Sequence, residues 1–291
     1  MGEDMSRQLY LACVLFALTG LMALPAAAAG GPEIKIVGTR ASSTDVESLQ
    51  RGARLFVNHC LNCHSAQYMR YNRLTDLKLT PDQIKQNLMF SADKIGDTMN
   101  VAMSAKEARE WFGAVPPDLS VMARSYTAER LGAYLRGFYV DSARETGWNN
   151  IISPNIGMPH VMAELQGTPT LKQTVFKADG KAIRSDQEAY ARARAAFIAS
   201  DTIAAFEEHV EKKDGKTETH YIVRNLVPAT DGLMTPQQFD AAMADLVNFM
   251  GYMAEPYRNQ RVQIGIIVLL LLGLLLPAAY WLKKEYWKDV T

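Results

Sequence analysis

Cys60, Cys63 and His64 form the pattern C-x-x-C-H, which is typical of the covalent attachment site of a c-type haem. On one turn of helix the two thiols project to the same side, so each can form a thioether with one vinyl group of the porphyrin. The histidine that follows can offer its ring to the iron as an axial ligand, a common way of holding haem. The motif therefore predicts one covalent haem c, held by Cys60 and Cys63, with His64 on the iron.

Two other kinds of site use the same residue types. A lone C-x-x-C can be a dithiol redox pair, but such a pair usually comes with a β-α-β pattern, which the surrounding sequence lacks. Cysteine and histidine can also bind zinc, which takes about four ligands. The third cysteine, Cys13, lies in a segment that we expect to be removed, and the other histidines considered show no paired ligand spacing: His160, His209 and His220. The context favours haem.

A second iron ligand is predicted in the loop 147–159, which has no helical periodicity. Gly157-Met158-Pro159 resembles the way in which c-type cytochromes present a thioether sulfur, because glycine lets the backbone come close and proline stiffens the loop. Met158 is therefore the predicted sixth ligand, and histidine–methionine ligation raises the reduction potential relative to two histidines. The alternatives are Met99, Met162 and His160.

Pro116 and Pro117 fix an extended backbone that cannot be helical at the residue before each proline. Such a segment can form a pocket wall against a flat haem face, although an ordinary boundary between loop and helix explains much of it. Asp118 and Ser120 are expected to cap the helix that follows. Arg124 on that helix is a candidate partner for a haem propionate, since a guanidinium suits a carboxylate, and a solvated surface arginine is an equal alternative.

Helices are predicted on both sides of these motifs. Thr44 with Glu47 has the spacing of a capping box, and the apolar residues behind it recur at helical spacing up to Cys60. Thr80 and Thr235, each followed by proline, are expected to open further helices. The apolar positions of the first helix are Val46, Leu49, Ala53 and Phe56.

The stretch between Gln166 and Pro228 has no evident relation to a haem site. It contains a predicted helix over 186–210 and a predicted strand over 220–227. We interpret residues 168–219 as a small α/β insertion that contacts a partner or covers the domain.

The two ends of the chain predict export and membrane anchoring. Residues 1–29 read as a secretory signal, with Arg7, an apolar run over 9–24 and small residues over 26–29 for cleavage. The run 262–282 is uncharged and, at about twenty-one residues, long enough to span a bilayer. Lysines and aromatic residues follow it, which places the tail 283–291 in the cytoplasm by the positive-inside rule. The haem domain, residues 30–260, would then lie in the periplasm of a bacterium, held by the anchor helix 261–282.

Charge and composition exclude other classes of function. The 291 residues have a formal net charge of zero, so the basic patch or stripe typical of nucleic-acid-binding domains is not indicated. No set of residues suggests a nucleophile with its acid and base. We therefore expect the chain to be non-catalytic alone and to be a subunit of a larger oxidoreductase.

The order of the motifs resembles the cytochrome c1 family, the haem subunits of the ubiquinol–cytochrome c reductase (bc1) complex, of proteobacterial type. The resemblance covers the signal peptide, C-x-x-C-H, Pro116 to Ser120, the Met158 loop and the anchor with its tail Lys-Lys-Glu-Tyr-Trp-Lys. It implies a mainly α cytochrome c-type haem domain with one C-terminal transmembrane helix.

The resemblance also implies roles and partners. Cys60 and Cys63 would be the thioether cysteines, His64 and Met158 the axial ligands, and Pro116-Pro117 the pocket wall. The partners would be cytochrome b, the Rieske iron–sulfur protein as electron donor, and a cytochrome c as acceptor. Two alternatives stay open: a membrane-anchored cytochrome c acting as an independent periplasmic carrier or terminal-oxidase subunit, and an exported haem enzyme such as a peroxidase.

Overall fold

The computed structural model describes residues 32–37, 45–177, 183–213 and 216–289. By their contacts, residues 1–33 form one unit and residues 34–291 another, so the described fold lies almost entirely in the second. The predicted signal peptide, its cleavage region and Thr44 lie outside the described residues.

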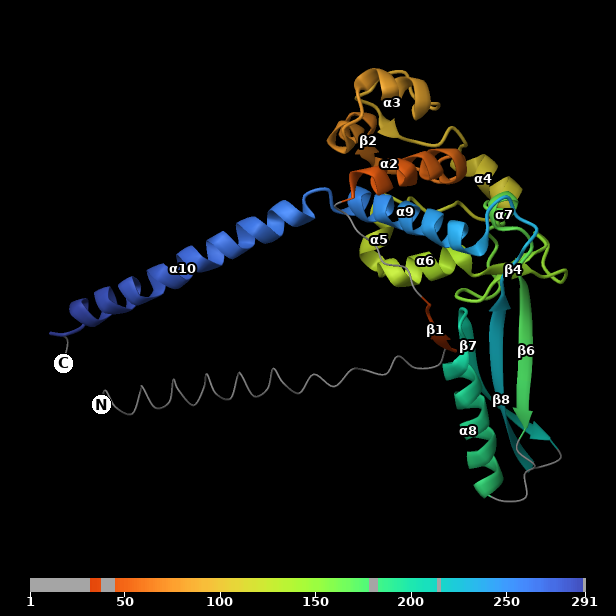
Figure 1. The fold of residues 1–291 in the computed structure, drawn as a ribbon. Helices are drawn as coiled ribbons and strands as arrows, with labels where there is room; N and C mark the ends of the chain where they lie inside the picture. The colour runs from red at the N-terminus through yellow and green to blue at the C-terminus, as the bar shows by residue number, and fades with distance from the viewer. Residues whose placement is uncertain (1–31, 38–44, 178–182, 214–215, 290–291) are drawn as a thin grey trace. The chain divides into compact units, whose positions relative to one another are not determined.

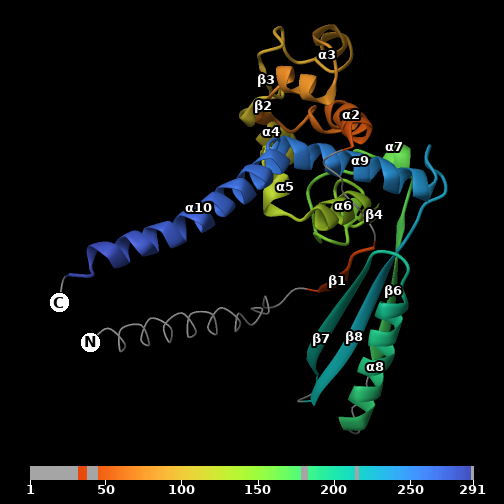
Figure 2. The same cartoon turned by 60° about the vertical axis from the view of Figure 1, so that its left-hand side comes forward.

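Two helices far apart in the chain pack side by side: α2 (Val46–Leu55) and α9 (Pro236–Ala254) (Figures 1 and 2). The apolar face predicted for α2 is correct, because Leu49, Ala53 and Phe56 are buried in the main hydrophobic core. Phe56 also contacts Phe249 of α9, with ring centroids 5.5 Å apart. The capping prediction was off by one residue: the Asp45 carboxylate accepts the first free backbone N–H groups of α2.

Gly52 lies where the two helices come closest. A Cβ atom built there would be 2.0 Å from the backbone oxygen of Asp245. Beside this crossing, the Asp245 carboxylate accepts hydrogen bonds from the Arg51 guanidinium and the Ser48 hydroxyl, each at 2.6 Å. The α2–α9 pair, and with it the position of the C-x-x-C-H motif, therefore depends on the absence of a side chain at residue 52.

Gly52→Ala is expected to lower the free energy of unfolding by about 1–3 kcal/mol, the usual cost of overpacking. Alanine favours a helix over glycine by only about 1 kcal/mol, and backbone cannot move aside as a flexible side chain can. Thermal unfolding of the variant measures the loss. Gly96→Ala is the matched control, because a Cβ there meets nothing within 4 Å; equal melting temperatures for the two variants would contradict the close crossing.

Short elements make up the chain between α2 and Gln166. Capping boxes begin α3 at Thr80 and α9 at Thr235, which confirms both predicted starts. The elements after α2 are the π-helix η1 (Phe56–Cys60), β2 (Ala66–Arg70), the 3₁₀-helix η2 (Tyr71–Leu77), α3 (Pro81–Asn87), β3 (Thr98–Met99), α4 (Ala105–Phe112), α5 (Met122–Ser125), α6 (Ala128–Arg136), β4 (Phe138–Val140), β5 (Trp148–Asn150) and α7 (Ala163–Gln166).

The insertion predicted over 168–219 belongs to a sheet covered by one helix, and its last strand continues beyond that range to Val227. Its elements are β6 (Thr170–Lys177), α8 (Ile183–Ala199), β7 (Ala204–Lys213) and β8 (Lys216–Val227), and β1 (Glu33–Lys35) completes the sheet in the order β1-β7-β8-β6. The helix α8 lies alongside the strands (Figure 1). Alanines and Phe197 of α8 pack on Phe206, Tyr221 and Val223 of the sheet. Ile203 and Leu226, where β7 begins and β8 ends, pack on Ile151 and Ile152. The insertion thus covers part of the helical domain.

The helix predicted over 186–210 is wrong beyond Ala199. Residues from Ala204 form β7 and pair antiparallel with β8 over ten positions, from Ala204↔Asn225 to Lys213↔Lys216. Antiparallel pairing with β8, the next strand in the chain, overrode the helical propensity of the alanines and charged residues. The strand predicted over 220–227 is confirmed as part of β8.

The helix α10 (Arg258–Tyr286) contains the predicted anchor. It follows α9 after a turn at Glu255 and Pro256, and it contains a candidate membrane span, Gln260–Tyr286, whose large apolar side chains are exposed. At 1.5 Å per residue these 27 residues span about 40 Å, more than the roughly 30 Å of hydrocarbon in a bilayer. The described residues thus show the predicted fold class: a mainly helical domain with a small α/β insertion and a C-terminal apolar helix that fits a membrane anchor.

Candidate functional site

The C-x-x-C-H motif begins in the last turn of the helix that carries it. The chain widens from α-helix to π-helix at Phe56 to Cys60, a local change found often at functional sites. After Cys60 the backbone N–H groups of Cys63 and His64 both donate to the Cys60 carbonyl, at 3.1 and 2.9 Å. Both cysteines are free thiols in the described structure, with Cys60 buried and Cys63 half-buried.

The environment of the two thiols argues against a dithiol redox pair. Burial, reinforced by the nearby Cys63, raises the pKa of the Cys60 thiol to about 12, and burial also raises the pKa of Cys63. Redox-active C-x-x-C pairs instead have a lowered thiol pKa, because the thiolate is the nucleophile. Zinc gains no support either: within the described ranges, no group of three or more His, Cys, Asp and Glu side chains is placed to hold a metal ion.

His64 is oriented by a single backbone carbonyl. Its Nδ1 lies 2.7 Å from the carbonyl oxygen of Pro117. Since a carbonyl can only accept, Nδ1 carries the proton and Nε2 keeps its lone pair. Burial lowers the pKa of His64, which keeps the ring neutral at neutral pH. A neutral imidazole with its other nitrogen bound to a carbonyl is the form in which histidine ligates a metal, so His64 fits the predicted haem.

The segment with Pro116 and Pro117 is fastened beside His64 by the residues that follow it. Asp118 accepts the backbone N–H of Gln67 at 2.9 Å, and the Ser120 hydroxyl accepts that of Tyr68 at 3.1 Å. The prediction that Asp118 and Ser120 cap the next helix was therefore wrong, because they bind β2 and α5 has no side-chain cap. This contact across the chain holds the Pro117 carbonyl opposite the His64 ring.

Met158 is placed differently from the two rival methionines. Its sulfur accepts a hydrogen bond from the Tyr134 hydroxyl at 3.1 Å. Burial raises the pKa of Tyr134 to about 12, so this hydroxyl keeps its proton at neutral pH. Met99 and Met162 are packed into the hydrophobic core, with at most 1% of their surface exposed. Unlike these two, Met158 has a polar partner on its sulfur, and its role as the sixth iron ligand stays a prediction.

The loop that carries Met158 is braced by two consecutive asparagines. The Asn149 side-chain oxygen accepts the Asn155 backbone N–H at 2.8 Å, and the Asn150 oxygen accepts that of Ile152 at 2.9 Å. The Asn150 amide also donates to the Tyr134 carbonyl at 2.8 Å, which ties the loop to α6. Sequence reasoning missed this role, although two polar residues inside an otherwise irregular loop were a signal for it.

His160, the remaining rival ligand, stacks on Phe138 with ring centroids 4.7 Å apart and meets the edge of Trp148 at 4.9 Å. Burial lowers its pKa to about 4. His160 is therefore a neutral side chain packed between two aromatic rings. It lies two residues after Met158 in the chain.

Tyr134→Phe is expected to lower the reduction potential of the haem-bound protein by about 20–60 mV. This corresponds to the loss of one hydrogen bond with a net free energy of about 0.5–1.5 kcal/mol. The donated proton draws electron density from the Met158 sulfur and so favours reduced iron. Redox titration followed by absorbance measures the shift. Tyr190→Phe in the insertion is the control, and an equal potential in wild type and Tyr134→Phe would contradict a role for this bond.

Arg124 has a protein partner in the structure. Its guanidinium lies 2.9 Å from Glu255, at the end of α9, and Arg261 reaches the same carboxylate at 3.2 Å. The hydrogen bond from Arg124 holds the pKa of Glu255 below its usual range. The geometry ties Arg124 to the junction between α9 and α10, and its role toward a propionate stays a prediction.

The residues that could hold the cofactor form two groups: the C-x-x-C-H motif with the proline segment, and the Met158 loop. Both groups adjoin the main hydrophobic core. Leu119, next to the proline segment, and Tyr134, under Met158, both pack against the main hydrophobic core. Large apolar side chains near the proline segment remain more than two-fifths exposed and offer a nonpolar surface to a porphyrin: Phe112, Val115 and Val121. The chemistry of this donor set fits a c-type haem.

Comparison with known proteins agrees with this geometry. A family model described as the cytochrome C1 family matches residues 38–290. The chain is 36% identical over 286 residues to a cytochrome c1 of Allochromatium vinosum, covering 98% of this chain and 99% of that one. It is 38% identical over 278 residues, 95% and 98% of the two chains, to a Nitrosomonas europaea protein named ammonia monooxygenase gamma subunit. A mitochondrial cytochrome c1 heme protein of Schizosaccharomyces pombe is 23% identical, over 89% of this chain and 71% of its own.

Proposed function

Because the chain belongs to the cytochrome c1 family, we propose that it is the electron-transfer subunit of a ubiquinol–cytochrome c reductase. Family membership makes it a haem-bearing electron-transfer protein that uses haem c. In this proposal it takes electrons from a Rieske iron–sulfur protein and delivers them to a cytochrome c. The observation that carries the proposal is the His64–Pro117 hydrogen bond, because it sets the ring for metal ligation next to two free thiols.

The bound haem supplies one-electron chemistry, and the residues of this chain set where and at what potential it occurs. Cys60 and Cys63 provide the covalent tether. His64 is held as a neutral ring by Pro117, and Met158 presents a sulfur whose electron density Tyr134 draws on. The proposed function requires no proton transfer by a side chain. This agrees with the raised pKa values of the Cys60 thiol and the Tyr134 hydroxyl.

The proposed location is the cytoplasmic membrane of a bacterium, with the haem domain in the periplasm. The candidate span within α10 supports a single-pass anchor. Lys283, Lys284 and Lys288 at its far end favour a cytoplasmic tail. Cytochrome b would lie beside this helix.

Co-purification tests the partners. A tagged full-length chain solubilised in mild detergent is expected to bring down a cytochrome b and a Rieske protein together with the haem-stained band. Ubiquinol should then reduce the haem in this preparation, whereas the same protein separated from its partners should not respond. Isolation of the haem protein alone, from membranes in which a bc1 complex stays intact without it, would contradict the proposal and favour an independent carrier or an oxidase subunit.

A second candidate follows from the name of the Nitrosomonas europaea relative, which assigns that protein to an ammonia monooxygenase. The same preparation distinguishes the two assemblies. Recovery of monooxygenase subunits in place of cytochrome b and the Rieske protein would favour the second.

A further inference from the structure

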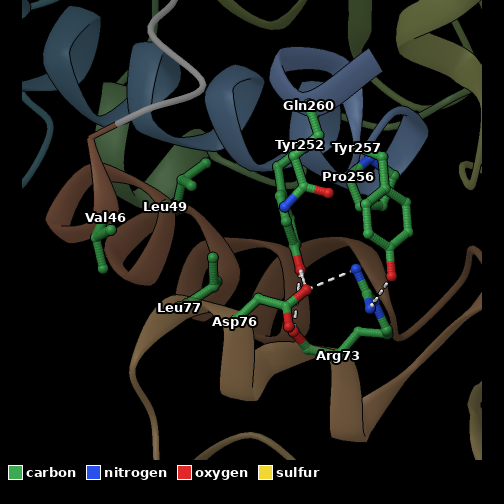
Figure 3. Close-up of a pocket in the computed structure, with 9 residues that line it drawn as sticks. All are labelled: Val46, Leu49, Arg73, Asp76, Leu77, Tyr252, Pro256, Tyr257 and Gln260. Atoms are coloured by element: carbon green, nitrogen blue, oxygen red, sulfur yellow. Dashed lines mark hydrogen bonds and ion pairs between the residues drawn. The ribbon is translucent and has the colours of Figure 1, made fainter. Parts of the chain in front are cut away.

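A cavity of about 380 Å³ lies between η2, the start of α2 and the junction of α9 with α10 (Figure 3). It is separate from the residues of the candidate haem site. Its polar residues come from two sides, Arg73 and Asp76 from η2 and the others from the α9–α10 junction. The lining residues are Val46, Leu49, Arg73, Asp76, Leu77, Tyr252, Pro256, Tyr257 and Gln260.

The cavity holds one fixed positive charge and one fixed negative charge side by side. The Arg73 guanidinium lies 2.6 Å from the Asp76 carboxylate and donates to the Tyr257 hydroxyl at 2.8 Å (Figure 3). The Tyr252 hydroxyl donates to the same Asp76 oxygen at 2.8 Å. Both charged side chains keep about a third of their surface exposed, at 31% and 40%, so a ligand can reach them.

The position of the cavity along α10 places it at the surface of the membrane. Gln260, which lines the cavity, begins the candidate span, and the uncharged run begins two residues later. Two residues of helix rise only about 3 Å, and the headgroup layer is roughly 5–7 Å thick on each side of the hydrocarbon. The charged pair therefore lies at headgroup height when α10 crosses a bilayer.

We propose that this cavity binds the headgroup of a zwitterionic phospholipid, of the phosphatidylethanolamine class. The lipid phosphate would face Arg73 and the proton of the Tyr257 hydroxyl, and its ammonium would face Asp76. An anionic headgroup without an ammonium would place its charge against Asp76. A choline headgroup has no N–H donor for that carboxylate. Val46, Leu49 and Leu77 close the apolar side of the cavity.

The inference rests on α10 lying in a bilayer, which is part of the proposed function, and not on the haem. The test uses the full-length protein, delipidated in detergent and titrated with lipids of identical acyl chains while native mass spectrometry counts bound molecules. Phosphatidylethanolamine is expected to occupy one site about tenfold more tightly than phosphatidylglycerol or phosphatidylcholine, the effect of one charge-assisted hydrogen bond. Inorganic phosphate and O-phosphoethanolamine are the water-soluble ligands in the comparison, and both are expected to bind far more weakly than phosphatidylethanolamine.

Single substitutions test the contributions of the Asp76 and Arg73 charges separately. Asp76→Asn should remove the preference for ethanolamine, whereas Arg73→Gln should weaken all three lipids. Tyr257→Phe changes a 57% exposed side chain, so it tests the phosphate contact without disturbing the core. Arg51→Gln is the matched control, because Arg51 forms a comparable ion pair with Asp245 outside the cavity. The haem spectrum and melting curve of each variant show that it is folded.

Three results would overturn the inference. Phosphatidylglycerol could bind as tightly as phosphatidylethanolamine, or the preference could survive Asp76→Asn. Soluble phosphoethanolamine could bind as well as the lipid, which would make the site one for a free headgroup. A photoreactive side chain at position 260 could crosslink to a protein and not to lipid in the membrane, which would make the cavity a subunit contact.

Discussion

Met158→Leu is expected to leave the haem covalently attached and to lower its reduction potential by more than about 100 mV, within the roughly 0.8 V that axial ligands span. Leucine has nearly the volume of methionine but no donor atom, so the loop keeps its packing while the iron loses a thioether that favours the reduced state. The open sixth position should also let the reduced protein bind carbon monoxide at neutral pH. A redox titration and a carbon monoxide difference spectrum measure the two effects.

Met162→Leu is the matched control for this experiment. It makes the same chemical change four residues away, at a side chain that is 1% exposed in the core. Its potential should stay that of the wild type. A Met158→Leu protein with unchanged potential and no carbon monoxide binding would remove Met158 from the iron, and His160 would then be the first rival to replace.

Replacing both Cys60 and Cys63 with alanine is expected to abolish covalent haem. Each thiol can form one thioether, and without them the porphyrin is held by ligation and packing alone, which denaturation removes. Haem staining on a denaturing gel should therefore fall from a strong band to background.

The control for this variant is Cys13→Ala, since Cys13 lies in the predicted signal peptide and should not affect the stain. Persistence of the haem band in the Cys60→Ala, Cys63→Ala protein would end the interpretation of the motif as a c-type attachment site. Immunodetection of the protein on the same gel shows that loss of stain is not loss of the chain.

The parts of the site that could be predicted from the sequence are those whose chemistry is local. The C-x-x-C-H spacing, the Gly-Met-Pro loop and the proline pair each have their meaning within a few residues. The helices begun by Thr80 and Thr235 were predictable for the same reason, because a capping box closes within one turn.

The parts that could not be predicted join residues far apart in the chain. Asp118 and Ser120 have the residue types of helix caps, yet they bind the backbone of β2, about fifty residues earlier. Tyr134 lies on α6, and its hydroxyl reaches Met158 because the segment with Asn149 and Asn150 folds back on that helix.

X-ray absorption at the iron edge of the purified, oxidised protein tests the central claim most directly, that an imidazole and a thioether hold one covalent haem. The predicted coordination is five nitrogen donors, four from the porphyrin and one from His64, with one sulfur donor that disappears in Met158→Leu. A coordination shell without sulfur in the wild type, or a sulfur donor that persists in Met158→Leu, would contradict it.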